Sequence, residues 1–186
     1  ELLAESIDAF KNSKIDEFWN LVSVVNGMAG NRAEFYRQAG DQMADQQAYL
    51  PAAVFYLQVF RYDPSILKPE QSIRMRQIIF QEAKNKDIGK LFQGTREDPL
   101  YLIVLSRYEA YNKTDLGEAK RRMGDLTGDP KIVKAYPEVN LVMAELDLKI
   151  NDPTSARRIL TGMVDNTELP AWVREEARAL LNGLPK

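Results

Sequence analysis

The sequence predicts an all-α protein built from antiparallel pairs of helices, and three observations lead to this fold class. Apolar residues recur at helical spacing along most of the chain, most clearly between residues 33 and 66. All of the prolines except Pro185 stand at or near the start or the break of a predicted helix. No stretch alternates apolar and polar residues as a half-buried strand does. We therefore expect roughly ten to twelve helices and no sheet.

Residues 33–66 carry the clearest pattern and predict two helices that fold back on each other. Gly40 and Ala52 stand twelve positions apart on the facing surfaces, so the two helices are expected to cross closely there. Asp63-Pro64 ends the pair. The apolar faces of the two helices consist of Tyr36, Ala39, Gly40 and Met43, and of Ala52, Phe55, Tyr56, Val59 and Phe60.

These spacings resemble the tetratricopeptide repeat (TPR), a helix–turn–helix unit of 34 residues. Met43 and Val59 depart from the family pattern, which more often has an aromatic residue and Ala at these places. The resemblance implies a right-handed α-solenoid that binds other proteins and catalyses no reaction. The residues that carry the resemblance are Tyr36, Ala39, Gly40, Met43, Ala52, Tyr56, Val59 and Pro64.

We expect a single helical-repeat domain over residues 1–186, in which other segments repeat this plan less clearly. A divergent helix pair at 1–30 comes first, and a capping helix at 170–182 closes the array. Three repeat units lie between them and follow the 33–66 unit, at 68–99, 100–131 and 137–168. The 68–99 unit is the weakest, because Met75 and Asp87 replace the expected Gly and Ala. Its second helix is expected over residues 87–92, with a stop at Gly94.

Local signals predict where the later helices begin and end. A helix begins at Pro69, whose fixed φ suits a first helical turn, and Asp98-Pro99 closes that unit. Asp115 with Glu118 predicts a capping box for a helix over 116–126, and Asp129-Pro130 closes the 100–131 unit. Asp152-Pro153 predicts an N-cap followed by Pro at the first helical position.

Composition argues against several classes of function. The chain has 25 Lys and Arg against 27 Asp and Glu, a net charge of −2, so no general attraction to nucleic acid is expected. It contains no Cys and no His, which removes thiolate ligands, cysteine nucleophiles and the commonest general base. Asp41 and Asp45, one turn apart, are interpreted as part of a solvated face. We expect no catalysis, no cofactor and no metal.

The candidate binding residues follow from the resemblance, in which the first helix of each pair lines a concave groove. Tyr101, Tyr108 and Tyr111 fall on one stripe of such a helix and are the candidate anchors, since Tyr is favoured at binding hot spots. Arg37 and Arg107 are the expected flanking donors. The alternative interpretation is that the tyrosines only pack against the neighbouring repeat.

The function predicted from the sequence is therefore a TPR-like scaffold that binds a protein or peptide partner through its concave groove. The alternative is an assembly module that self-associates as a homo-oligomer within a larger, membrane-anchored protein. The chain begins with Glu1 and contains no apolar run of ~18–20 residues, so any anchor is expected outside it. The lack of cysteine is compatible with either the cytoplasm or a cell envelope.

Overall fold

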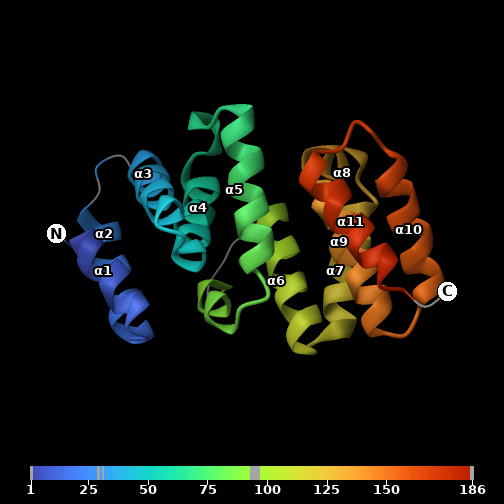
Figure 1. Ribbon diagram of the computed structural model, residues 1–186, viewed down its shortest axis with the longest axis horizontal. Coiled ribbons are helices and arrows are strands. Elements are labelled where there is room, and N and C mark those ends of the chain that lie inside the picture. The colour runs from blue at the N-terminus through green and yellow to red at the C-terminus, as the bar shows by residue number, and fades with distance from the viewer. Residues whose placement is uncertain (1, 29, 31, 93–96, 185–186) are drawn as a thin grey trace. The chain divides into compact units, whose positions relative to one another are not determined.

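The protein is all-α. A computed structural model describes residues 2–28, 30, 32–92 and 97–184, and in these ranges it contains eleven α-helices, two short 3-10 helices and no strand (Figure 1). This confirms that the fold is all-α, as predicted, while the arrangement in antiparallel pairs stays a prediction. The helices group into two compact units, Glu1–Glu82 and Ala83–Lys186, which are described one at a time. The expectation of one repeat array running through both units stays a prediction.

The N-terminal unit is organised around one buried helix, α4. Each of the eleven residues from Leu50 to Phe60 is buried, so this helix is covered on all sides. It packs against α3 and α5, and α1 packs against α2. The predicted pairs at 1–30 and 33–66 thus both occur as helices in contact. The elements of the unit are α1 (Leu2–Lys11), α2 (Ile15–Met28), α3 (Arg32–Asp45), α4 (Tyr49–Tyr62), η1 (Pro64–Ile66) and α5 (Pro69–Glu82).

The helices α3 and α4 approach closely at Gly40, as the sequence indicates, but the contact involves Tyr56. A Cβ added at Gly40 would lie 2.5 Å from Cε1 and 2.6 Å from Cδ1 of Tyr56. The Tyr56 ring is fully buried, and its hydroxyl donates to Oδ1 of Asp41 at 2.9 Å. Ala52 is also fully buried, but none of the three atoms nearest to the added Cβ belongs to it. Gly40 is therefore required because the ring of Tyr56 occupies the space that a side chain would need.

In the C-terminal unit α6, α7 and α9 contact one another, α10 packs on α9, and α11 packs on α10 and α9. The predicted second helix of the 68–99 unit is a 3-10 helix that packs on α6, and its expected stop at Gly94 lies outside the described residues. The elements are η2 (Lys86–Phe92), α6 (Pro99–Asn112), α7 (Leu116–Thr127), α8 (Pro130–Ala135), α9 (Glu138–Lys149), α10 (Pro153–Asp165) and α11 (Ala171–Asn182).

Three Asp-Pro pairs start helices in this unit. The carboxylates of Asp98, Asp129 and Asp152 accept hydrogen bonds from backbone N–H groups of the helices that follow, at 2.9, 2.8 and 3.1 Å. The prediction for Asp152-Pro153 is confirmed. Asp98-Pro99 and Asp129-Pro130, which were expected to close units, instead open α6 and the short helix α8, which the sequence reading missed.

The predicted capping box at Asp115 is wrong. Asp115 adopts a left-handed conformation with φ of 45°, and its side chain makes no capping hydrogen bond. The carboxylate of Glu118 instead accepts from Nε and Nη2 of Arg121, at 2.9 and 2.6 Å. The sequence pattern fits a capping box, but the tight turn after α6 places Asp115 in a geometry that cannot supply one.

Candidate functional site

The three candidate tyrosines on α6 have different surroundings. Tyr101 is only 3% exposed, whereas Tyr111 is 54% exposed. Tyr108 is half-buried and packs against η2, where a Cβ added at Gly89 would lie 3.0 Å from its Cζ. The expectation that Tyr101 faces an open groove is therefore wrong, because α7, α9 and η2 cover α6 on several sides. Of the three tyrosines, Tyr111 has the most exposed side chain.

Arg107 is buried instead of being a flanking donor. Its side chain is 1% exposed, and its Nε and Nη2 donate to the carboxylate of Glu145 on α9 at 3.0 and 2.9 Å. A buried guanidinium needs such a partner, because an unpaired charge in the interior is strongly destabilising. Arg107 therefore positions Glu145 and joins α6 to α9, and it is not available as a ligand donor at the surface.

Arg37 lies on α3 in the N-terminal unit and is held by two carboxylates. Its Nη2 is 2.6 Å from Glu34 and its Nη1 is 2.8 Å from Asp41. The hydrogen bonds from Arg37 are the main reason that the pKa of Glu34 is lowered to about 2. Arg37 belongs to the N-terminal unit, whereas the three tyrosines belong to the C-terminal unit. Glu34 and Asp41 on its own helix already offset its charge.

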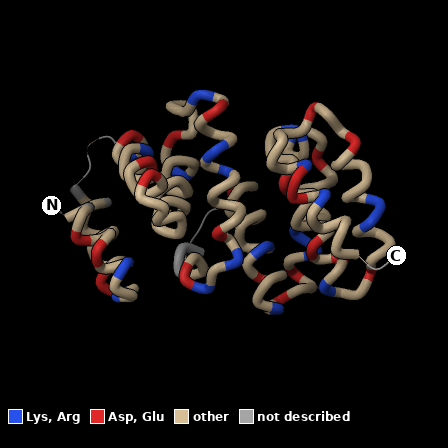
Figure 2. Tube along the Cα trace, in the orientation of Figure 1, with Lys and Arg blue, Asp and Glu red and all other residues tan. Residues whose placement is uncertain are grey.

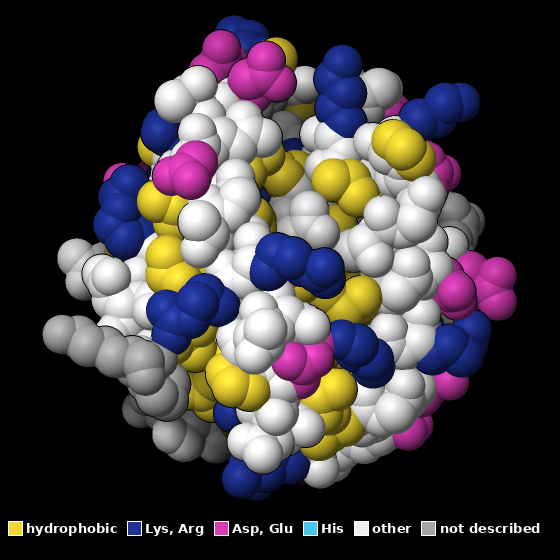
Figure 3. Space-filling view, turned by 90° about the vertical axis from the view of Figure 1, so that its right-hand side faces the viewer, with side chains coloured by type: hydrophobic (Ala, Val, Ile, Leu, Met, Phe, Trp, Pro, Cys, Tyr) yellow, Lys and Arg dark blue, Asp and Glu magenta, His cyan; other side chains and the backbone are white. Residues whose placement is uncertain are grey.

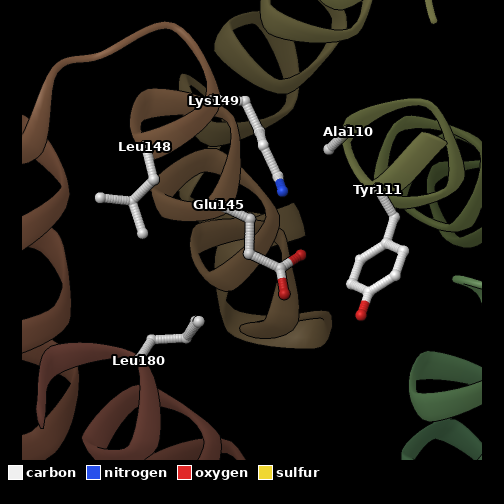
Figure 4. Close-up of a pocket in the computed structure, with 6 residues that line it drawn as sticks. All are labelled: Ala110, Tyr111, Glu145, Leu148, Lys149 and Leu180. Atoms are coloured by element: carbon white, nitrogen blue, oxygen red, sulfur yellow. The ribbon is translucent and has the colours of Figure 1, made fainter. Parts of the chain in front are cut away.

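A cavity of about 220 Å³ opens beside Tyr111, between α6, α9 and α11. Figure 4 shows its lining, in which Tyr111 faces Glu145 and Lys149, and Leu180 lies across from them. Most of these side chains are apolar or expose apolar carbon. The lining residues are Ala110 and Tyr111 from α6, Glu145, Leu148 and Lys149 from α9, and Leu180 from α11.

Two lysines flank the exposed tyrosine. The Nζ atoms of Lys84 and Lys149 lie 5.2 and 5.5 Å from the centroid of the Tyr111 ring, within the range of cation–π contacts. The backbone carbonyl of Lys84 accepts a hydrogen bond from the side chain of Asn112 at 3.3 Å, which fixes this residue beside the end of α6. An exposed tyrosine with two lysines close to its ring and a largely apolar cavity next to it is the candidate site.

The walls of the candidate site are held by polar contacts between α6, α7 and α9. Arg122 on α7 donates to Ser106 and to Glu109 on α6, both at 2.7 Å, and Lys120 pairs with the buried Asp147 on α9. Burial raises the pKa of Glu109, while the hydrogen bond from Arg122 acts in the opposite direction. These contacts fix the relative positions of the helices that carry Tyr111 and Glu145.

Other features of the surface do not form a comparable site. Lys and Arg are interspersed with Asp and Glu in both units, and on the side of α10 hydrophobic side chains appear in several patches among charged ones (Figures 2 and 3). Asp41 and Asp45 line a polar cavity of about 210 Å³ with Arg74. Within the described ranges, no three acidic side chains converge as a metal would require. No helix in those ranges has the length and apolar character needed to cross a membrane.

Lys84, the cavity and the pairing of Arg107 with Glu145 were not predicted from the sequence. The spacing of the tyrosines did point to Tyr111. Lys84 and Lys149 are 65 residues apart, and no local pattern relates them to the tyrosine between them. Comparison of the chain with protein-family models, with curated proteins and with solved structures found no match.

Proposed function

We propose that this chain is a TPR-like scaffold, without catalysis of its own, that binds a protein or peptide partner. The partner contacts the surface formed by the first helices of successive pairs. The resemblance of residues 33–66 to the tetratricopeptide repeat gives this proposal its starting point. Its finer part, a right-handed α-solenoid with α11 as the cap, is a proposal about architecture that goes beyond the all-α fold.

The contacts of the C-terminal unit support the stacking of helix pairs. If α6 with α7 and α9 with α10 are successive pairs, then a solenoid requires α9 to touch both helices of the preceding pair. It does so, since α9 contacts α6 and α7. The helix α11 continues the order, because it contacts α9 and α10. Each repeat in such an array buries its apolar face against its neighbours.

The observation that carries the binding function is the exposed Tyr111 beside an apolar cavity, between the first helices α6 and α9. Binding energy at protein interfaces concentrates in a few anchors, and tyrosine is enriched among them. The cavity is smaller than the ~300–1,000 Å³ usual for small-molecule sites, so it suits one side chain of a larger partner. The interhelical ion pairs hold this surface in place before a partner arrives.

The experiment is a selection of peptides from a phage-displayed random library on the 186-residue chain, followed by measurement of Kd for each selected peptide. Tyr111→Ala should weaken binding about 30-fold, as expected for an anchor whose truncation costs about 2 kcal/mol. The matched control is Tyr49→Ala, which removes another exposed tyrosine (46%) on α4.

Equal Kd values for the parent and Tyr111→Ala would contradict the proposed surface. Light scattering at two concentrations separates the proposal from self-association. A constant monomer mass is the expected result, and a mass that rises with concentration would favour the assembly module.

A further inference from the structure

We infer that the cavity beside Tyr111 takes a bulky apolar side chain from a peptide segment whose neighbouring residues are acidic. This inference rests on the proposed function, because it specifies the chemistry of the partner at the same site. It differs from capture of a peptide's terminal carboxylate, since the groups recognised here are side-chain carboxylates next to an apolar anchor.

The apolar part of the inference follows from the lining. Leu148 and Leu180 line the cavity from α9 and α11, together with the ring of Tyr111 from α6, which is 54% exposed (Figure 4). A leucine or phenylalanine side chain placed there would remove apolar surface of both partners from water. A charged side chain in the same place would lose its hydration, and the leucines offer no hydrogen bond to compensate for that loss.

The acidic part follows from the balance of charge around the cavity. Among the described residues, Glu145 is the one acidic residue of the lining, and the buried guanidinium of Arg107 offsets that charge at 2.9 Å. Lys84 and Lys149 then contribute two positive charges within 5.5 Å of the centre of the Tyr111 ring. The C-terminal ends of α6, α9 and α11 each contribute about half a negative charge, so the two lysines leave the rim weakly positive.

The polar groups of the site also match an extended peptide. The Glu145 carboxylate points into the cavity (Figure 4), and its oxygens keep lone pairs beyond those that accept from Arg107. A backbone N–H of the bound segment can donate to it while the flanking carboxylates approach the lysines. The buried Arg107 pair thus presents an acceptor without adding net charge.

The test uses three fluorescent pentapeptides, each acetylated and amidated so that no terminal charge remains. The first has leucine at the centre and two glutamates on each side, the second replaces the glutamates with lysines, and the third replaces the leucine with alanine. Binding to the full chain is followed by fluorescence anisotropy at low salt. The first peptide should bind about tenfold more tightly than either of the others, and added salt should weaken it.

Two double variants with equal loss of charge test the lysines. Lys84→Ala/Lys149→Ala should weaken binding of the first peptide about tenfold, as expected for two partly exposed ion pairs. Lys131→Ala/Lys134→Ala removes two exposed lysines from α8, which supplies no lining residue, and should leave the affinity unchanged.

Equal affinity for the glutamate and lysine peptides, or equal loss in both double variants, would overturn the inference. So would failure of the first peptide to bind at millimolar concentration. If library peptides still depend on Tyr111 in that case, the proposed function stands and only the acidic preference fails. If no library peptide depends on Tyr111, the proposed function itself fails.

Discussion

Replacement of Gly40 by alanine tests the packing of the N-terminal unit with a single added carbon. The new Cβ would lie 2.5 and 2.6 Å from two ring carbons of Tyr56, which is well inside van der Waals contact. The ring cannot simply rotate away, because it is fully buried and its hydroxyl donates to Asp41 on the same helix as Gly40. Burial and this hydrogen bond also raise the pKa of Tyr56, so the hydroxyl stays protonated as a donor.

The expected change in the free energy of unfolding is the sum of two opposing effects. Overpacking of a buried contact costs about 1–3 kcal/mol. Alanine is favoured over glycine inside a helix by about 1 kcal/mol, which offsets part of that cost. We therefore expect Gly40→Ala to destabilise the protein by up to about 2 kcal/mol, and Gly40→Leu by about 3 kcal/mol because more atoms meet the same ring.

The matched control is Gly162→Ala on α10, where nothing lies within 4 Å of an added Cβ. This variant should be stabilised by about 0.5–1 kcal/mol, since only the helix propensity changes. Urea denaturation followed by circular dichroism gives both values. If Gly40→Ala gains stability to the same extent as Gly162→Ala, then the close approach of Tyr56 to the α3 backbone is wrong.

Two further predictions concern charged groups. Arg107→Met should destabilise the C-terminal unit by about 3–5 kcal/mol because it leaves Glu145 largely buried without its partner, and adding Glu145→Leu should recover most of this loss; additive effects in urea denaturation would contradict the pairing. The pKa of Glu34 is lowered from 4.5 to about 2, so its contribution to stability is present above pH 4.5 and is lost as the pH falls toward 2. Glu34→Gln should therefore lose less stability than the parent between pH 5 and pH 2, by a small margin because the site is partly exposed; parallel acid titrations would rule this out.

The helices were predictable because their signals are local. Prolines mark the beginnings of α5 and α10, and a 3.6-residue period in α3 identifies its buried face. In α4 the periodic residues are only part of the buried surface, because this helix is covered on all sides. The Asp-Pro pairs show the limit of such signals. The same two residues can end one element and begin the next, and only the backbone conformation decides which. For this reason, Asp129-Pro130 predicts the end of a unit, although the same pair begins α8.

The burial of α6 was harder to predict because it depends on contacts distant in sequence. Its apolar residues lie nearly all round, which indicates a covered helix, yet the period alone does not say that Tyr101 is covered and Tyr111 is not. Arg107 and Glu145 are 38 positions apart, and charged residues ordinarily face solvent. The pairing that permits their burial is visible only when α6 and α9 are placed side by side.

Only the local part of the candidate site was predictable from the sequence. The tyrosine spacing pointed to Tyr111 together with Tyr108 and the buried Tyr101, because a helical stripe is a local property, and a binding role for Tyr111 stays a prediction. The residues around Tyr111 come from α6, α9 and α11, which line the cavity, and from Lys84, which precedes η2 in the sequence. A cavity that forms between separate elements leaves no pattern in any one of them.

A crystal structure of the chain with a peptide selected from the library tests the central claim most directly. We expect one peptide side chain in the cavity between Tyr111, Leu148 and Leu180, with the backbone of the peptide running along α6 and α9. A peptide bound elsewhere, with this cavity empty or filled by the protein's own side chains, would contradict it.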